Sequence, residues 1–414
     1  MTVDDEEVTL DAEQRGSLGT DERTALRRWL AATLRAPVDS LSVLADGLNL
    51  VVAVSTTSEA DAYVVRRPNE LRETALFVDT ATEYAVLERL VETPVPVPEP
   101  VAHCTDPSVL GAPFVVTEYR DGAVVPLGSR LPERYRTPAA REQLTWETVD
   151  TLARLHDVPV AQFRDVCEHH TPREQVAADV RRVERVADAV AADFADLLAV
   201  GDWLREHAPT DGPTRLVHGD FRPGNLLYAD DPDHAAANAP NGETADVPTR
   251  AATGTRGDEV ATATTATDGP LPRVAAVLDW ETPMLGDPRV EIGYLLLRWR
   301  DAGDVTPSLD GFAERYGEAT VADLREDNAV GMAPFTSEPG TPSRRAVLDR
   351  YERATGIVVD DPEYFLAHAA FTLAAVCADL HRRSVAAGAD SDHHAHADYL
   401  RAVAETVIDG RFEI

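Results

Sequence analysis

The chain contains no lysine. All 39 of its basic residues are arginine, against 72 aspartates and glutamates, and its formal net charge is −33. Without lysine it cannot carry a Walker A phosphate loop, and it cannot form a Schiff base with a carbonyl substrate or with pyridoxal phosphate. A field this negative also repels the phosphate backbone, so we expect no nucleic-acid partner.

Cysteine and long apolar runs are scarce as well. The three cysteines form no CxxC pair, which argues against a disulfide framework or a structural zinc site. The acidic N-terminus lacks the regions of a signal peptide, and no uncharged apolar run approaches the ~20 residues of a spanning helix. We therefore expect a cytoplasmic protein with no membrane partner. Dense carboxylates with arginine as the only cation resemble proteins of a very salty cytoplasm, where a Debye length of about 3 Å at 1 M salt screens their repulsion.

The first part of the chain alternates between two periodicities. Apolar residues recur at helical spacing soon after residue 20, and short β-branched runs with turn residues between them predict strands over 41–67. A helix at 81–90 and two more strand-like runs follow. The proline-rich segment 94–100 predicts a rigid extended connector. This part is therefore predicted to be a small β-rich unit.

The remainder is predominantly helical in pattern. A long amphipathic pattern covers 173–207, and the apolar stretch 365–380 predicts a core helix. Two strand-like runs, 225–228 and 274–278, predict a hairpin. The segment between them, 231–270, has no Ile, Leu, Met, Phe, Tyr or Trp, so it is predicted to be disordered. Residues 303–344 are predicted to be mainly loop.

Polar residues gather where these two strands meet. The segment His-Gly-Asp-Phe-Arg-Pro-Gly-Asn precedes the first strand, and Asp-Trp-Glu follows the second. A hairpin would bring Asn225 and Asp279 together, and their oxygen atoms suit Mg²⁺. Asp220 could accept a proton from a hydroxyl, and Arg222 offers positive charge to a phosphoryl group. The alternative is that Asp220 and Asn225 are turn residues that satisfy their own backbone.

These segments, 218–225 and 279–281, together with Gly-Asp-Pro at 286–288, resemble the aminoglycoside phosphotransferase family. This family comprises small-molecule kinases related to choline, homoserine and fructosamine kinases. Tyr63–Pro68 is similar to the family's strand with the phosphate-binding cation, and 94–100 is similar to its lead into the hinge. The resemblance implies an α+β, two-lobed protein-kinase-like fold with a small β-rich N-lobe and a larger, mostly helical C-lobe.

The resemblance also implies an organisation and a set of roles. A mobile acidic lead at 1–19 would precede a nucleotide-binding N-lobe at 20–119, a hinge at 120–122 and a catalytic C-lobe at 123–414. Asp220 would orient the acceptor hydroxyl and take its proton, with Arg222 near the γ-phosphate. Arg66 would contact the α/β-phosphates and form an ion pair with Glu83. Asn225 and Asp279 would hold Mg²⁺, and the backbone near Glu118 and Tyr119 would receive adenine.

Two features depart from the family pattern. The strand cation is Arg66, where the family has lysine, and a planar guanidinium meets phosphate differently from a compact ammonium. The loop at 44–49 has one glycine, Gly47, which with Asn49 is assigned to phosphate contact. Arg66 with Glu83 could alternatively be an ordinary surface ion pair.

Three neighbouring residues receive supporting interpretations. His218 is interpreted as orienting the loop, and Asp287 as bracing it by hydrogen bonds. Glu281 could be a metal neighbour or a surface carboxylate.

The sequence thus predicts Mg²⁺-dependent transfer of the γ-phosphate of ATP to a hydroxyl of a small molecule. The alternative is a non-catalytic nucleotide-binding scaffold that kept the fold. The presence of Asp220, Asn225 and Asp279 together favours the enzyme, because a degenerate kinase usually loses one of them. The acceptor, the choice between ATP and GTP, and the oligomeric state stay open at this point.

Overall fold

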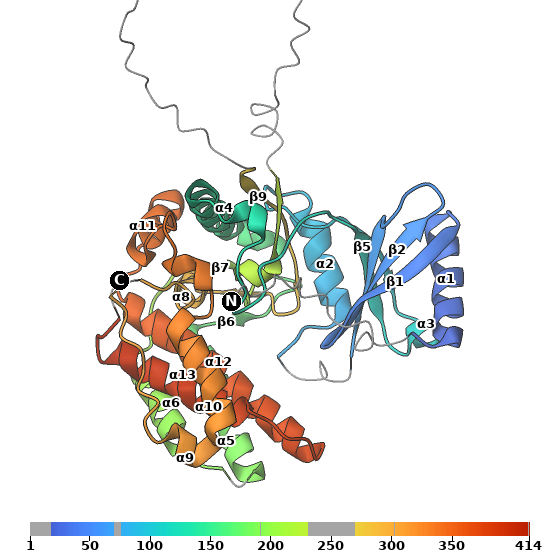
Figure 1. The fold of residues 1–414 in the computed structure, drawn as a ribbon. Helices are drawn as coiled ribbons and strands as arrows, with labels where there is room; N and C mark the ends of the chain where they lie inside the picture. The colour runs from blue at the N-terminus through green and yellow to red at the C-terminus, as the bar shows by residue number, and fades with distance from the viewer. Residues whose placement is uncertain (1–17, 70–75, 191, 231–269, 302, 413) are drawn as a thin grey trace, which may run out of the picture.

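A computed structural model describes residues 18–69, 76–190, 192–230, 270–301, 303–412 and 414. It has a small β-rich lobe and a larger helical lobe (Figure 1). The predicted fold class is therefore confirmed. The predicted disorder of 231–270 and nearly all of the predicted mobile lead at 1–19 fall outside the described residues.

The small lobe is built on one antiparallel sheet. Its five strands lie in the order β1-β2-β3-β5-β4, and α1 and α2 lie on opposite sides of it (Figure 1). Trp29 of α1 packs edge-on against Phe114 of the sheet, with ring centroids 5.0 Å apart. The elements are α1 (Thr20–Leu34), β1 (Val38–Asp46), β2 (Asn49–Thr56), β3 (Tyr63–Pro68), α2 (Thr80–Leu90), β4 (Pro100–Cys104), α3 (Pro107–Leu110) and β5 (Phe114–Glu118).

The helical lobe also holds two small sheets. β8 pairs with β9, and β10 lies between β6 and β7. The helices are α4 (Pro138–His156), α5 (Pro172–Ala189), α6 (Ala195–His207), α8 (Pro288–Leu296), α9 (Phe312–Tyr316), α10 (Glu318–Val330), α11 (Arg344–Thr355), α12 (Pro362–Ala386) and α13 (His393–Ile408). The strands are β6 (His169–His170), β7 (Arg215–Val217), β8 (Leu226–Asp230), β9 (Pro272–Val277) and β10 (Met284–Gly286).

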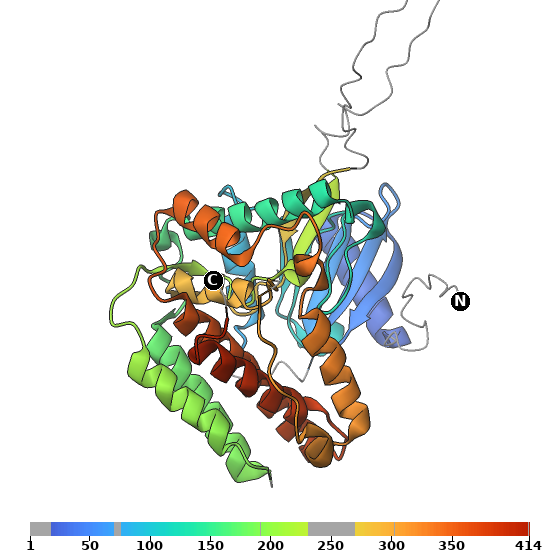
Figure 2. The same ribbon diagram turned by 60° about the vertical axis from the view of Figure 1, so that its left-hand side comes forward.

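The long helix α12 forms the centre of this lobe. By length and composition alone it could cross a membrane, but 61% of its most apolar window is buried inside the protein. α5 and α6 (green in Figure 2) pack on one side of α12 and α13 (red). Phe365, Leu366 and Phe371 are each at most 2% exposed. The prediction that this stretch is a core helix is confirmed.

The predicted hairpin is present as β8 and β9. Leu226 lies opposite Val277, and the N–H of Leu278 donates to the carbonyl of Asn225 at 2.8 Å. The two polar segments of the sequence therefore leave the hairpin side by side.

The chain enters the helical lobe against this hairpin. Ala123 and Tyr228 exchange two backbone hydrogen bonds of 2.8 Å. At Gly122 the backbone has φ +158°, and a Cβ there would lie 2.6 Å from Leu227 Cγ. Only glycine allows this close approach. The segment that joins the two lobes is thereby held against the hairpin.

Two helical predictions needed correction. The amphipathic pattern over 173–207 is two helices, because Val190 is extended (φ −124°, ψ 146°) and ends α5. The segment 303–344, predicted as loop, contains α9 and α10. These are short helices whose few apolar residues, including Phe312 and Leu324, pack into a satellite core.

Candidate active site

The segment between β7 and β8 is held by a buried histidine. His218 is fully buried. Its Nδ1 accepts the N–H of Asp220 (3.2 Å), so the ring proton lies on Nε2, which donates to the carbonyl of Leu278 at 2.7 Å. One side chain thus joins the loop to the end of β9, as its interpretation as an orienting residue predicts.

A buried carboxylate from α8 lies beneath the same loop. Oε1 of Glu291 accepts the N–H of Gly219 (2.7 Å), and Oε2 accepts the N–H of His218 (3.1 Å). Oε2 also lies 3.0 Å from Nε2 of His156, whose Nδ1 is 2.6 Å from the hydroxyl of Tyr351. Glu291 is 2% exposed. Because buried N–H groups need acceptors, this carboxylate fixes the position of the backbone that carries Asp220.

Asp220 is surrounded by donors. Tyr294 donates its hydroxyl to Oδ1 at 2.6 Å, Arg222 donates Nε to both oxygens at 3.1–3.2 Å, and Asn225 donates Nδ2 to Oδ2 at 2.8 Å. Burial alone would raise the pKa of Asp220. The charges of Arg222 and Arg298 and the Tyr294 hydrogen bond outweigh it, and the net pKa is lowered. Asp220 is therefore a carboxylate at neutral pH, and 28% of its side chain is exposed.

Arg66 collects three carboxylates at the junction of the lobes. It forms an ion pair with Glu83 of α2, and its Nη2 lies 2.9 Å from Asp279 and 2.7 Å from Glu281. Burial lowers the pKa of Arg66, but these carboxylates outweigh it and the net pKa is raised. The side chains of Arg66 and Glu83 are only 13% and 5% exposed. The predicted contact is thus present and is not a surface ion pair. Glu281 is a neighbour of the cluster rather than a surface carboxylate.

Asp279 and Asn225 offer the oxygen atoms expected of a magnesium site. Asp279 has φ +61°, a left-handed conformation that aspartate tolerates better than most residues. Its side chain is 42% exposed, against 12% for Glu281. The amide nitrogen of Asn225 donates to Asp220. The amide oxygen of Asn225 is therefore directed away from Asp220. No group of three or more His, Cys, Asp or Glu in the described part of the chain could hold a metal. Two hard oxygen donors fit an ion such as Mg²⁺, which keeps waters and shares substrate phosphates.

The two loop residues assigned to phosphate contact differ in their surroundings. Asn49 donates Nδ2 to Oε2 of Glu281 at 3.2 Å, so it belongs to the Arg66 cluster. Gly47 lies in the β1–β2 turn, where its N–H donates to the carbonyl of Asn49 at 3.1 Å. Among the described residues, no atom would lie within 4 Å of a Cβ at Gly47.

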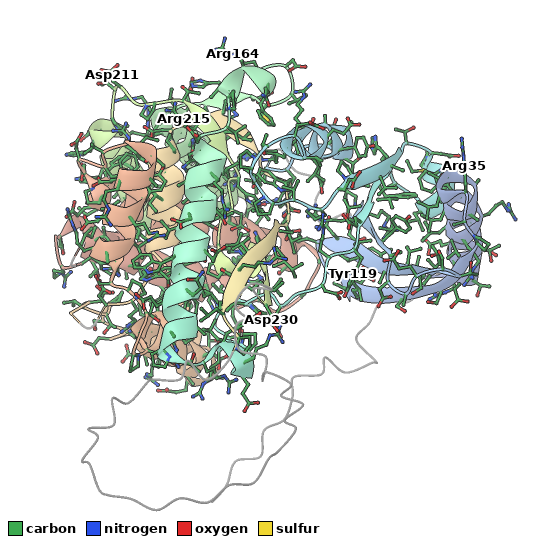
Figure 3. All side chains as sticks on the ribbon, turned by 90° about the horizontal axis from the view of Figure 1, so that it is seen from above. Arg35, Tyr119, Arg164, Asp211, Arg215 and Asp230 are labelled. Carbon is green, nitrogen blue, oxygen red and sulfur yellow. The ribbon has the colours of Figure 1, made fainter. Side chains whose placement is uncertain are left out.

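The predicted adenine contacts lie at the other end of the sheet. Tyr119 lies where the sheet meets the helical lobe (Figure 3). The N–H of Glu118 donates to the carbonyl of Glu99 (2.8 Å), and that of Tyr119 to the carbonyl of Ala62 (3.0 Å). A base at this edge would therefore have to use carbonyl oxygens or the N–H of a later residue.

Asp287 stands apart from Asp220 and its donors. It caps α8 by accepting the N–H of Arg289 at 3.0 Å, and its carboxylate pairs with the Arg289 guanidinium at 2.6 Å. It is 5% exposed. This arrangement agrees with its interpretation as a brace, because it sets the start of the helix that carries Glu291.

The sequence analysis missed three residues of α8 and the turn after it. Glu291, Tyr294 and Arg298 follow one another at spacings of three and four, and so share one helix face. In an otherwise apolar segment that follows Gly-Asp-Pro, this polar stripe was the available signal.

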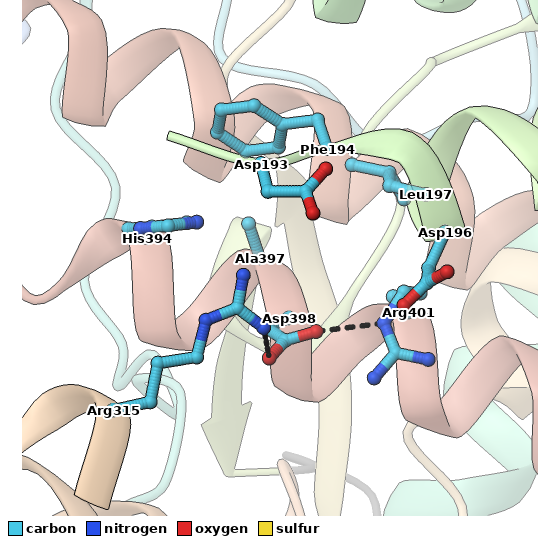
Figure 4. Close-up of a pocket in the computed structure, with 9 residues that line it drawn as sticks. All are labelled: Asp193, Phe194, Asp196, Leu197, Arg315, His394, Ala397, Asp398 and Arg401. Carbon is cyan, nitrogen blue, oxygen red and sulfur yellow. Dashed lines mark hydrogen bonds and ion pairs between the residues drawn. The ribbon is translucent and has the colours of Figure 1, made fainter. Parts of the chain in front are cut away.

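A small pocket between α6, α9 and α13 lies far from these residues in the sequence and has another character. Asp398 pairs there with Arg315 (3.2 Å) and Arg401 (2.7 Å), as Figure 4 shows. The lining residues do not include the motif residues.

The two-lobed, kinase-like fold brings Asp220, Asn225 and Asp279 to one end of the β8–β9 hairpin, and Arg66 faces Asp279 from the small lobe at 2.9 Å. Residues 40–237 match the model of the phosphotransferase enzyme family. A putative aminoglycoside phosphotransferase from Ralstonia eutropha JMP134 superposes with a TM-score of 0.63 at 23% identity, covering 93% of this chain and 97% of that one. The GDP complex of aminoglycoside 2′-phosphotransferase-IIIa superposes with a TM-score of 0.52 at 13% identity, covering 94% and 99%.

A relative of another name also matches by sequence. Human acyl-CoA dehydrogenase family member 11 is 23% identical over 354 residues, which cover 83% of this chain. The chain spans only about a third (36%) of that protein's length. The similarity therefore concerns one portion of the larger relative.

Proposed function

We propose that this chain catalyses Mg²⁺-dependent transfer of the γ-phosphoryl group of ATP to a hydroxyl of a small molecule in the cytoplasm. The observation that carries the proposal is the convergence of Asp220, Asn225 and Asp279 at one end of the β8–β9 hairpin. It is supported by the position of Arg66, which faces Asp279 from the other lobe at 2.9 Å. Phosphoryl transfer relies on positioning and charge, and these are the groups it needs.

In the proposed reaction the acceptor oxygen attacks the γ-phosphorus, and the bond from phosphorus to the bridging oxygen of ADP breaks. Asp220 orients the acceptor and takes its proton. Arg222 places positive charge beside Asp220 at 3.1 Å, where negative charge builds up on the transferring group. Asn225 and Asp279 would hold Mg²⁺, which supplies charge neutralisation to the phosphate oxygens.

Arg66 pairs with Asp279, the proposed metal ligand, so the proposed complex requires this ion pair to open. The α/β-phosphates would take the place of Asp279 on Arg66 and free that carboxylate for Mg²⁺. Asn49 and Gly47 would cover the phosphates, and adenine would lie against the backbone near Glu118 and Tyr119.

We expect MgATP to raise the melting temperature of the protein by several degrees. A ligand at ~100 times its dissociation constant stabilises a folded protein by about 2.7 kcal/mol. The measurement is thermal unfolding with ATP or GTP, each with Mg²⁺ or with EDTA. GTP is included because a solved structure of similar fold holds GDP. No shift with either nucleotide would contradict the proposal, whereas a shift without any phosphate transfer would favour the scaffold alternative.

We expect Asp279→Asn to remove most of the Mg²⁺-dependent part of that shift. The neutral amide is a weaker ligand for a hard cation, whereas the contacts of Arg66 to phosphate remain. Asp202→Asn, which changes a 68% exposed carboxylate on α6, is the control and should behave as the wild type. An unchanged Mg²⁺ dependence in Asp279→Asn would place the metal elsewhere.

A further inference from the structure

The buried arginines of the described residues differ in whether they form an ion pair with a carboxylate. Five arginines are less than a tenth exposed, and four of them pair with a carboxylate. The pairs are Arg141 with Glu338, Arg182 with Asp179, Arg289 with Asp287, and Arg344 with Asp304. The fifth, Arg298, is 3% exposed and forms no ion pair within the described part of the chain. Acidic residues outnumber basic ones by 72 to 39, so this exception calls for a cause.

The contacts of Arg298 satisfy only part of its guanidinium. Nη1 donates to the carbonyl of Tyr294 at 2.7 Å, and the group stacks over the Tyr294 ring with its central carbon 3.8 Å from the centroid. Nε is buried and has no hydrogen-bond partner among the residues that the structure describes. A buried charge is costly unless it is paired. The guanidinium is therefore held in place without a direct ion pair among the described residues, and Asp220 is the carboxylate on which its charge acts.

Arg298 lies between the catalytic loop and a cavity. The ring on which it stacks donates its hydroxyl to Asp220 at 2.6 Å, and the charge of Arg298 helps to lower the pKa of Asp220. Arg298 also lines a cavity with Arg300, Met332 and Phe412. Arg300 also forms no ion pair among the residues that the structure describes. All residues of this cavity belong to the helical lobe, whereas Arg66 lies in the small one.

We propose that Arg298 binds an anionic group of the acceptor, a carboxylate or a phosphate, while the acceptor hydroxyl faces Asp220. The inference rests on the proposed function and names the class of its acceptor. A planar guanidinium binds both kinds of anion through paired N–H donors. A cationic group placed at Arg298 would be repelled by the guanidinium, in spite of the negative charge of the whole chain.

A series of acceptors built on one three-carbon diol varies the charged group that Arg298 would meet. Glycerol is neutral, glycerate carries a carboxylate, glycerol 3-phosphate carries a phosphate, and 3-amino-1,2-propanediol is cationic. With MgATP present, we expect at least a tenfold higher kcat/KM for one of the two anions than for glycerol, with the cation the poorest. The two anions distinguish a carboxylate from a phosphate as the recognised group.

The same series on Arg298→Met separates recognition from structure. We expect the preference for the anion over glycerol to fall at least tenfold, because only one member of each comparison has a group for Arg298. Arg345→Met, which changes a 61% exposed arginine on α11, should keep the wild-type preference. A general loss of folding would lower all four rates together and leave their ratios unchanged.

Several results would overturn the inference. One is a wild-type preference for glycerol or for the cation, and another is an anion preference that survives in Arg298→Met. If no member is phosphorylated, we still expect the anions, and not glycerol, to raise the melting temperature of the MgADP complex. The absence of that shift would also overturn it. Failure of the proposed function is distinguishable, because MgATP itself would then give no shift.

Discussion

Asp220→Asn should lower kcat by about 10²–10⁴-fold, the range contributed by a positioned general base. The amide keeps the size of the side chain and can still accept from Arg222, but it cannot take the proton of the acceptor. The measurement is ADP release from MgATP with whichever acceptor the wild type phosphorylates fastest. Nucleotide binding should persist, because Asp220 lies on the acceptor side of the Arg66 cluster in the proposed reaction. The thermal shift with MgATP should therefore equal that of the wild type.

The pH profile gives a second check on Asp220. Its pKa is lowered from the ordinary 3.8, so the charged form persists to a lower pH than usual. A carboxylate of this kind loses no charge between pH 6 and 8, and any loss of rate in that range must come from another group. Asp202→Asn serves again as the exposed control. Full turnover by Asp220→Asn would show that another group takes the proton.

Much of this site follows from local sequence. The hairpin could be predicted because a polar segment precedes one short apolar run and follows the other, and pairing such runs leaves little freedom of register. The residues at its open end, Asn225 and Asp279, then have to meet. The partner of Arg66 on α2 could likewise be predicted from the family resemblance.

The remaining partners of Arg66 come from distant sequence. Asp279 and Glu281 join Arg66 and Glu83 from about two hundred residues further along the chain, and no pattern within either segment records that contact. The strands β6 and β10 are two and three residues long, too short to show a period. The break at Val190 has no such distant cause: the extended backbone of this one residue ends α5 (φ −124°, ψ 146°), and α6 begins at Ala195.

The lysine-free composition has a consequence for how this site works. A lysine would meet the phosphates as a compact charge, whereas the guanidinium of Arg66 engages Glu83, Asp279 and Glu281 simultaneously. Arginine's several donors in one plane make that possible. The cluster thereby ties the small lobe to the helical lobe. Exchange of Asp279 for phosphate would then couple nucleotide binding to release of the metal ligand.

The carboxylate beneath the loop should matter more for stability than any other single group at the site. Glu291 accepts two backbone N–H groups and lies within hydrogen-bond distance of His156. Glutamine offers one oxygen and an amide that donates, so Glu291→Gln must direct a donor at a donor. Each buried polar group left unpaired costs about 1–3 kcal/mol. We expect the free energy of unfolding in urea to fall by about 2–5 kcal/mol, in the range found when a buried charged network is broken.

The activity of Glu291→Gln should fall together with its stability. The thermal shift with MgATP distinguishes a displaced base from a loss of nucleotide binding. The N–H groups of His218 and Gly219 directly precede Asp220, so losing their acceptor moves the base while Arg66, Asp279 and the nucleotide contacts stay in place. At a temperature where the variant is folded, kcat should drop while the MgATP shift persists. Glu314→Gln, at an exposed site on α9, should change stability by less than about 0.5 kcal/mol. If Glu291→Gln matched Glu314→Gln in both measurements, the backbone of the loop would be held by the hairpin and His218 alone.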